Sequence, residues 1–192
     1  MMDLWQLPEK TTIDGKTYHL HTDYRDILEI FSYLDDPQLP EPVRWRIALA
    51  LFYEEPVPAH SYQPAMDYLT EFLCAGAKVQ PGPRLMDWNH DAGAILAGVN
   101  RAAGMEIRGL KYVHWWTFLS WFHAMEPGQL STLVSIRDRL RRGKPLEPWQ
   151  QEFYRNDPKA VLLPERLSSR EAAQKDALLA RLNRGKGEVH GT

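Results

Sequence analysis

Apolar residues recur every three or four positions along most of the chain, which is the spacing of amphipathic helices. The first such run follows Thr22 and Asp23, either of which can cap a helix, and Pro37 forbids its continuation. Later runs also end near proline or glycine. The pattern predicts helices over residues 24–34, from Pro42 to before Pro56, over 64–75, 88–103, 112–125 and 129–142, one or two turns over 148–154, and a last helix over 172–184.

Several of these helices have a row of residues at helical spacing, and we expect the row of the third helix to face inward. The row is Val43, Ile47, Ala50 and Leu51 in the second helix, Ala65, Tyr68, Leu69, Phe72 and Leu73 in the third, and Leu130, Leu133, Val134, Arg137 and Leu140 in the sixth. The last helix has a plausible capping box in Ser168 and Glu171. Its large apolar residues are few, so we expect it to pack weakly.

A short β-hairpin is predicted before the first helix. The stretch TTIDGKTYHL, residues 11–20, places Asp14-Gly15 between two short β-prone runs. This dipeptide favours a type I′ turn, because both turn positions require a positive φ.

The stretch KYVHWWTFLSWF, residues 111–122, is the most aromatic part of the chain. It is too short and too polar to span a bilayer, which takes about eighteen apolar residues. On a helix, its aromatic residues form one broad face, while Val113, Thr117, Ser120 and Ala124 form a row of small residues opposite. We interpret it as a central core helix enclosed on most sides; the alternative is a face held open for a partner peptide. The expected core scaffold is Trp88, Trp115, Trp116, Phe118, Leu119, Trp121 and Phe122.

Together these elements predict a mainly α fold. We expect one compact multi-helix domain over residues 1–165, built around the tryptophan-rich helix and opened by the hairpin. Residues 166–192 are expected to form a weakly packed helical or disordered tail.

Composition and charge narrow the possible partners. The 192 residues are 44% hydrophobic and 25% charged, with a formal net charge of −2, which is ordinary for one globular domain and gives no basic excess for nucleic acid or an anionic membrane. Cys74 is the single cysteine, so an intramolecular disulfide is impossible. The first residues, MMDLWQLPEK, lack the pattern of a secretory signal. We therefore expect a cytoplasmic protein.

Asp87, His90 and Asp91 are the best candidates for a metal site, because they lie on one helix face at i, i+3 and i+4. Acidic residues in a first helical turn also simply complement the helix dipole, and we favour that interpretation. His114 and His123 would lie on opposite sides of a helix, so they cannot share an ion.

The remaining reactive residues also have simpler explanations. His19 and His21 share one side of a strand but would need two further ligands, and Cys74 has no sequence signature that pairs it with a base. We expect solvated histidines and a small buried thiol. The sequence therefore predicts no catalytic residue, no metal and no cofactor, and the protein is expected not to be an enzyme.

A basic cluster ends the sixth helix. It consists of Arg137, Arg139, Arg141, Arg142 and Lys144. Positive charge in a last helical turn complements the carbonyl end, so we expect a solvated terminus; an acidic protein partner or a phosphate backbone is the alternative.

A resemblance takes the interpretation further. The segments DGKTYHLHTDYRDILEIFSYL, RIALALFYEE, LMDWNHDAGAILAGVNRAAGMEI, YVHWWTFLSWFHAM and SIRDR, in this order, resemble a family of small proteins of long-tailed bacteriophages and prophages. Genes of this family lie between those for the major tail protein and the tape measure protein. The resemblance covers about residues 11–163, and HWWTFL, residues 114–119, is its most specific part. The arginine-rich RDRLRRGKP segment and the chain after about Leu167 do not match.

The resemblance implies a tail assembly chaperone in the host bacterial cytoplasm, with the tape measure protein and possibly other tail proteins as partners. It implies no catalytic or ligand residues. A chaperone for an apolar helix needs an exposed apolar surface. We predict that Leu178, Leu179 and Leu182, or one edge of the tryptophan helix, contact the partner. The alternatives are a structural tail or connector component of the virion and, less favoured, an enzyme or small-ligand protein with a pocket near Asp87.

Overall fold

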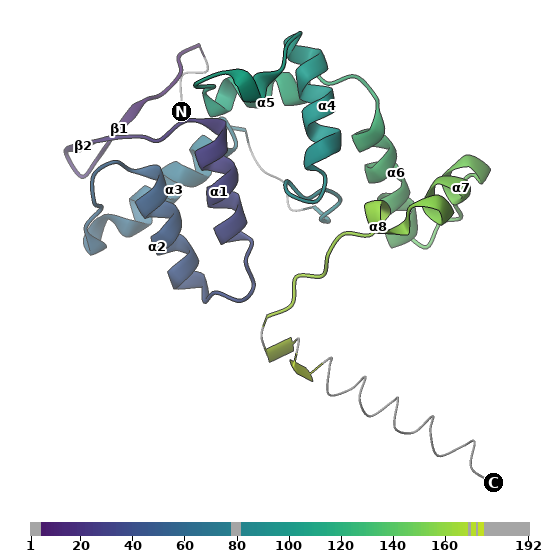
Figure 1. Cartoon of the computed structure of the whole chain (residues 1–192). Helices are drawn as coiled ribbons and strands as arrows, with labels where there is room; N and C mark the ends of the chain where they lie inside the picture. Colours follow the sequence, from purple (N-terminus) through teal and green to yellow (C-terminus); the bar gives the residue numbers. More distant parts are fainter. Residues whose placement is uncertain (1–4, 78–81, 169, 172, 175–192) are drawn as a thin grey trace.

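The structure, a computed structural model, describes residues 5–77, 82–168, 170, 171, 173 and 174. It is mainly α-helical with one short antiparallel hairpin, as the sequence predicts (Figure 1). The elements in order are β1 (Lys10–Ile13), β2 (Lys16–His19), α1 (Tyr24–Leu34), α2 (Glu41–Phe52), η1 (Ala59–Ser61), α3 (Tyr62–Leu73), α4 (Ala92–Ala103), η2 (Ile107–Gly109), α5 (Trp115–His123), α6 (Gln129–Arg141), α7 (Pro148–Asn156) and α8 (Pro158–Val161).

The helices form two groups joined by α4 and α5 (Figure 1). Helices α1, α2 and α3 pack on one another beside the hairpin, and α5 contacts α1. On the other side, α4 contacts α6, and the short helices α7 and α8 complete that end of the molecule. Within the residues that the structure describes, every helix is too short or too polar to cross a lipid bilayer.

The hairpin turn has the predicted geometry. Lys10 pairs with His19 and Ile13 with Lys16, which leaves a two-residue turn. Asp14 has φ 49° and Gly15 has φ 80°, so both turn residues adopt the positive φ that a type I′ turn requires. Ser61 Oγ donates to Asp14 Oδ2 at 2.6 Å and ties the turn to the start of α3.

The first and third helices also follow the sequence. Asp23 caps α1, because its carboxylate accepts the Arg25 amide at 2.9 Å. The face of α3 that points into the core consists of Ala65, Leu69, Phe72 and Leu73, with Tyr68 partly buried beside them.

The apolar row that the sequence shows in α2 is not the buried face of this helix. The buried residues are Ala48, Leu49 and Phe52, whereas Val43 and Ala50 are exposed. Apolar residues occur around the whole circumference of this helix, so periodicity does not select a face. Packing decides instead, because the Phe52 ring lies 4.9 Å from the ring of Phe72 in α3.

The fourth helix begins later than predicted, at Ala92. Asp87 does cap backbone amides, but those of Asn89 and His90 in a separate turn at 3.0 and 2.8 Å. The C-terminal end of α4 is as expected, since Gly104 has φ 69° in the left-handed region.

The tryptophan-rich helix α5 forms the centre of the larger core, but it is shorter and less enclosed than predicted. It begins at Trp115, while Tyr112 lies before it with half of its surface exposed; Ser120 and Ala124 are also exposed. Two of the four small residues, Ser120 and Ala124, therefore face solvent, whereas Val113 is buried and Thr117 is partly buried. Trp115, Trp116, Phe118 and Leu119 are buried, and Trp88, Trp121 and Phe122 are partly buried against them.

Two indole N–H groups connect α5 to the end of α3. Trp115 Nε1 donates to the Leu73 carbonyl and Trp116 Nε1 to the Phe72 carbonyl, each at 2.9 Å. Carbonyls in the last turn of a helix have no partner within that helix. The two tryptophans therefore satisfy buried polar groups while they fill the core.

A second, smaller core lies under α6, α7 and α8. Its buried members are Ala94, Leu133, Ile136 and Val161. Gln150 is buried beside it and donates to Ser135 Oγ at 3.2 Å. This core fixes α8, and with it the position from which the chain returns toward α1.

Candidate functional site

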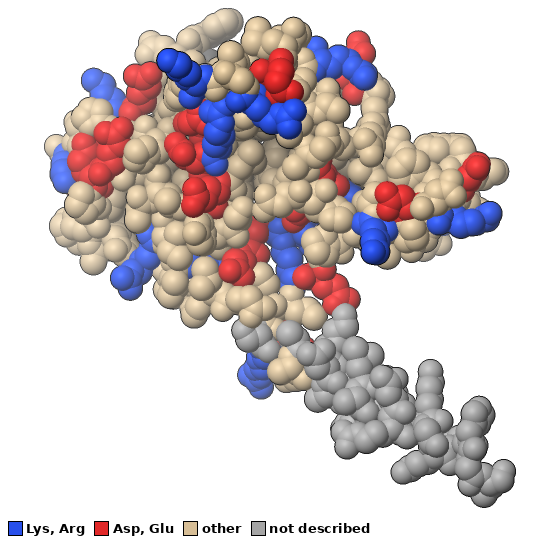
Figure 2. All heavy atoms as spheres, viewed as in Figure 1, with Lys and Arg blue, Asp and Glu red and all other residues tan. Residues whose placement is uncertain are grey.

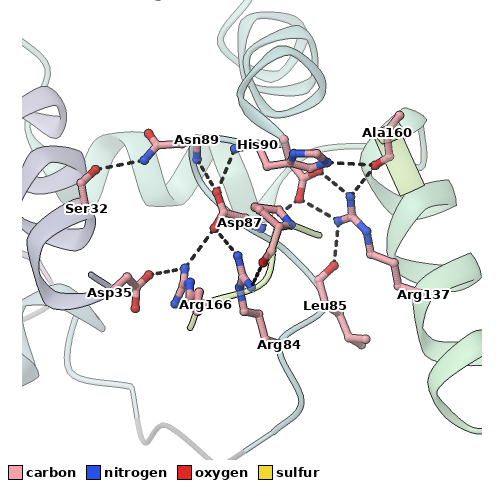
Figure 3. A network of polar contacts seen from close by, with 12 residues as sticks. Ser32, Asp35, Arg84, Leu85, Asp87, Asn89, His90, Arg137, Ala160 and Arg166 are labelled. Atoms are coloured by element: carbon pink, nitrogen blue, oxygen red, sulfur yellow. Dashed lines mark hydrogen bonds and ion pairs between the residues drawn. The ribbon is translucent and has the colours of Figure 1, made fainter. Parts of the chain in front are cut away.

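A network of polar contacts lies where α1, the 84–91 segment, α6 and the chain after α8 meet (Figure 3). Three arginines, Arg84, Arg137 and Arg166, and three carboxylates, Asp35, Asp87 and Asp91, form its centre.

The most buried part of the network is the ion pair of Asp91 and Arg137. Arg137 Nη2 and Nη1 donate to Asp91 Oδ1 and Oδ2, both at 2.7 Å. The two side chains are only 1% and 6% exposed, and the amide of Asp87 donates a further hydrogen bond to Asp91 Oδ2 at 2.9 Å. The bidentate geometry matches the planar guanidinium to the carboxylate.

Arg137 also binds backbone carbonyls from two other segments. It donates to the carbonyls of Leu85 at 2.9 Å and Ala160 at 2.8 Å (Figure 3). Its Nε also donates to the Val161 carbonyl at 2.7 Å. The sequence placed Arg137 in a solvated basic cluster, and this is wrong. One arginine joins α6, α8 and the 84–91 segment, because a buried guanidinium needs a carboxylate and several acceptors.

The rest of the basic cluster is at the surface. Arg139 pairs with Glu147 at 2.7 Å, and Arg141 and Arg142 share Asp138. Over the face seen in Figure 2, acidic and basic side chains both occur, and one group of basic side chains near the top of the view has acidic side chains beside it. These contacts suit a solvated helix end.

Asp87 forms the more exposed part of the network. Arg84 Nη2 donates to its Oδ2 at 2.5 Å and Arg166 Nη2 to the same oxygen at 3.0 Å. Burial alone would raise the pKa of this carboxyl, but the hydrogen bonds from the His90 amide, Arg84 and Arg166 outweigh it and hold the pKa well below its ordinary value. Asp87 therefore carries a charge at any physiological pH.

The geometry does not favour a metal at Asp87, His90 and Asp91. The two carboxylates face arginines, and His90 Nε2 lies 3.3 Å from the Ala160 carbonyl. In the described part of the chain, no group of three or more histidine, cysteine, aspartate or glutamate side chains is arranged to hold an ion. What the network can do is bind segments of chain to one another.

His114 has a role that the sequence analysis missed. It is the N-cap of α5: its Nδ1 accepts the Trp116 amide at 3.0 Å, and its Nε2 lies 3.3 Å from the Pro8 carbonyl. Nδ1 must therefore be unprotonated, and in the neutral ring Nε2 carries the proton. The cue was its position directly before the aromatic run, where a helix needs a capping acceptor.

This histidine predicts a pH dependence of stability. Burial lowers the pKa of His114 below its ordinary value of 6.5, although Pro8 and Glu9 oppose the shift. The folded state thus favours the neutral ring. The contribution of His114 to the free energy of unfolding is therefore complete above about pH 6.5 and is lost as the pH falls through the lower pKa of the folded state. We expect the His114→Asn variant, which keeps a capping acceptor, to lose less stability than the wild type between pH 7.5 and 5, measured by urea unfolding.

His19 is the matched control, because its pKa moves the opposite way. The hydrogen bond and charge of Glu55, whose Oε1 lies 2.7 Å from Nδ1, raise the pKa of His19. Its contribution is present at low pH and lost as the pH rises. A His19→Asn variant should therefore lose more stability on acidification than the wild type, and equal slopes in all three proteins would contradict both assignments.

An open apolar groove lies between α4, the end of α5 and the start of α6. It encloses about 420 Å³ and is lined mainly by apolar groups, among them Gly98, Phe122, Met125, Leu130 and Val134. A Cβ at Gly98 would collide with the sulfur of Met125, so glycine leaves room for the Met125 side chain in the lining of the groove. The sequence pattern did not predict this groove, because its walls come from three separate helices.

The structure describes Cys74 but does not describe the predicted partner contacts near the C-terminus. Cys74 is partly buried, and burial raises the pKa of its thiol, which disfavours the reactive thiolate. The predicted partner contacts Leu178, Leu179 and Leu182 lie outside the described residues.

Comparison with known proteins places these features in a family. The family described as Bacteriophage Gp15 protein matches residues 4–156, which include the hairpin, the aromatic core, the three helices that line the groove and the Asp91–Arg137 pair. No curated protein and no solved structure matches the chain. Because the match covers well over half of the sequence, the chain belongs to the Bacteriophage Gp15 protein family.

Proposed function

We propose that this bacteriophage protein is a tail assembly chaperone that keeps the tape measure protein soluble until tail tube subunits enclose it. The observation that carries the proposal is the family match over residues 4–156. The gene position that the sequence resemblance implies would also suit this role. A tape measure protein is long, helical and apolar, so before assembly it needs a partner that covers apolar helix surface.

The groove between α4 and α6 supplies a surface of this kind. Amphipathic helices bind in grooves through apolar side chains at helical spacing. Phe122, Met125, Leu130 and Val134 are each partly buried, so they line a formed groove and still offer apolar surface to a partner. The role needs no reacting group, which agrees with carboxylates that are paired with arginines. We therefore propose binding by apolar contact and no enzymatic activity.

Co-expression with the tape measure protein tests this function. We expect the wild-type chain to increase the soluble fraction of the tape measure protein several-fold, and Val134→Glu to abolish most of that increase, because it places a charge inside the groove. Leu140→Glu is the matched control: this residue lies on the same helix, is 37% exposed and is outside the groove. The measurement is the soluble fraction after centrifugation.

The outcomes separate the alternatives. Equal solubility with Val134→Glu and Leu140→Glu would remove the groove from the proposal. A chain that ends at Leu167 tests the predicted contact of Leu178, Leu179 and Leu182, and unchanged solubility would remove that segment. Mass spectrometry of purified particles tests the structural alternative, since stoichiometric copies of this chain in finished virions would contradict a chaperone.

A further inference from the structure

Residues 162–168, which we name the C-terminal strap, cross a site formed by other parts of the chain. The strap follows α8 and contains no helix or strand. It passes the 84–91 segment and reaches the end of α1 (Figures 1 and 3). Polar groups that hold it include those of Gln38, Asp35, Arg84 and Asp87.

The contacts have the chemistry of peptide recognition. Two are to main-chain carbonyls: Arg84 Nη1 donates to Pro164 O at 2.8 Å and Gln38 Nε2 to Leu167 O at 2.9 Å. Any extended peptide offers such carbonyls. The third contact is selective, because Arg166 Nη2 lies 2.6 Å from Asp35 Oδ2 and 3.0 Å from Asp87 Oδ2. Two carboxylates that converge on one position select a basic side chain.

The receptor is built independently of the strap. Asp87 is fixed by the Asn89 and His90 amides, and its ion pair with Arg84 does not involve Arg166. The receptor residues lie within the family match, which ends at residue 156, whereas the strap lies beyond it. The site is therefore a feature of the family part of the chain, and the strap comes from the part outside it.

The strap itself is weakly held. Leu162 is 52% exposed, and the Arg166 side chain is 31% exposed against 40% for Asp35. Ion pairs with this exposure contribute little to stability, and segments with few buried contacts open at low cost. A cavity of about 130 Å³ also remains beside Arg166, bounded by Phe31, Ser32 and Trp88 among others. The strap thus occupies the site without filling it.

We propose that the strap is an intramolecular stand-in for a partner protein, which binds this site with an extended segment that carries an arginine. The partner's arginine replaces Arg166 between Asp35 and Asp87, and its main chain replaces the carbonyls of Pro164 and Leu167. This site is separate from the apolar groove and does not depend on the proposed chaperone function. The strap protects the site until a partner displaces it.

Peptide binding to the full chain tests the proposal. The probe is a fluorescently labelled peptide of residues 162–174, LLPERLSSREAAQ. In the wild type, the strap competes with the labelled peptide for the site, and because it is tethered its effective concentration is high. Arg166→Glu opens the strap through repulsion from Asp35 and Asp87 but leaves the receptor intact. We expect the peptide to bind the Arg166→Glu chain at least tenfold more tightly than the wild type, measured by fluorescence anisotropy.

Matched controls make the result specific. Arg170→Glu changes the charge of an exposed residue four positions further on and should behave like the wild type. Asp35→Asn added to the Arg166→Glu chain should weaken peptide binding, as should glutamate in place of Arg166 in the peptide. Hydrogen exchange should become faster over 162–168 in the Arg166→Glu chain. If that variant unfolds, Arg166→Gln serves in its place.

Three results would overturn the proposal. One is equal peptide affinity for the wild type and the opened chain. Another is binding that tolerates the loss of the arginine in the peptide, since the carboxylate pair would then select nothing. The third is a dimer of the wild-type chain in which each strap occupies the site of the other copy, which would assign the site to self-association.

Discussion

Replacing Arg137 by alanine is expected to lower the free energy of unfolding by about 3–5 kcal/mol, the cost of leaving a buried charge without its partner. The carboxylate of Asp91 is 1% exposed and would keep only the hydrogen bond from the Asp87 amide. The carbonyls of Leu85, Ala160 and Val161 would lose a donor as well. Urea unfolding followed by tryptophan fluorescence measures the change.

Two comparisons show whether burial causes this loss. Arg141→Ala removes an arginine from the same helix whose side chain is 46% exposed, and we expect a change within about 0.5 kcal/mol. The double variant Arg137→Leu with Asp91→Leu should lose less stability than the two single variants predict by addition, because neither charge is then left unpaired. A loss below about 1 kcal/mol for Arg137→Ala would mean that water reaches Asp91.

The ion pair of Asp91 and Arg137 could not be predicted from the sequence alone. Asp91 and Arg137 are 46 positions apart, and each has a local explanation as a helix-end charge that complements a dipole. One signal was present in the pattern: Arg137 falls on the apolar row of α6, four positions after Leu133. A charge on the inward face of a helix needs a buried partner of opposite charge. Which carboxylate supplies it depends on how α4 and α6 pack.

Features that a few neighbouring residues determine were predictable. The Asp14-Gly15 turn, the Asp23 cap and the left-handed Gly104 depend on backbone chemistry within about four positions, and the structure has all three. The capping box of Ser168 and Glu171 is also formed, with the Ser168 amide 2.9 Å from Glu171 Oε2.

Features that depend on packing between distant segments could not be predicted from the sequence. The buried face of α2 is chosen by its neighbours, since the helix is apolar all round. The start of α5 is set across the fold: Asp23 Oδ2 accepts the Val113 amide at 2.9 Å, which holds the chain extended before Trp115. The groove and the strap site combine segments far apart in sequence, so the spacing of apolar residues along the chain could not predict them.

Trp115 carries the second large expected effect. Its side chain is fully buried, and its ring lies 5.4 Å from that of Phe118, 5.7 Å from Trp88 and 5.8 Å from Phe31. Trp115→Ala is expected to lower the free energy of unfolding by about 3–5 kcal/mol, because it leaves a large cavity in the core. It also removes the donor to the Leu73 carbonyl.

Conservative and exposed substitutions separate the causes of that loss. Trp115→Phe keeps an aromatic ring but removes the indole N–H, so we expect an intermediate loss of about 1–3 kcal/mol from the unsatisfied Leu73 carbonyl and the smaller ring. Trp149→Ala is the control, because this tryptophan is 54% exposed and should change stability little. If Trp115→Ala and Trp149→Ala had equal effects in urea unfolding, α5 would not be the centre of the core, and the aromatic cluster would not be the scaffold that positions the groove.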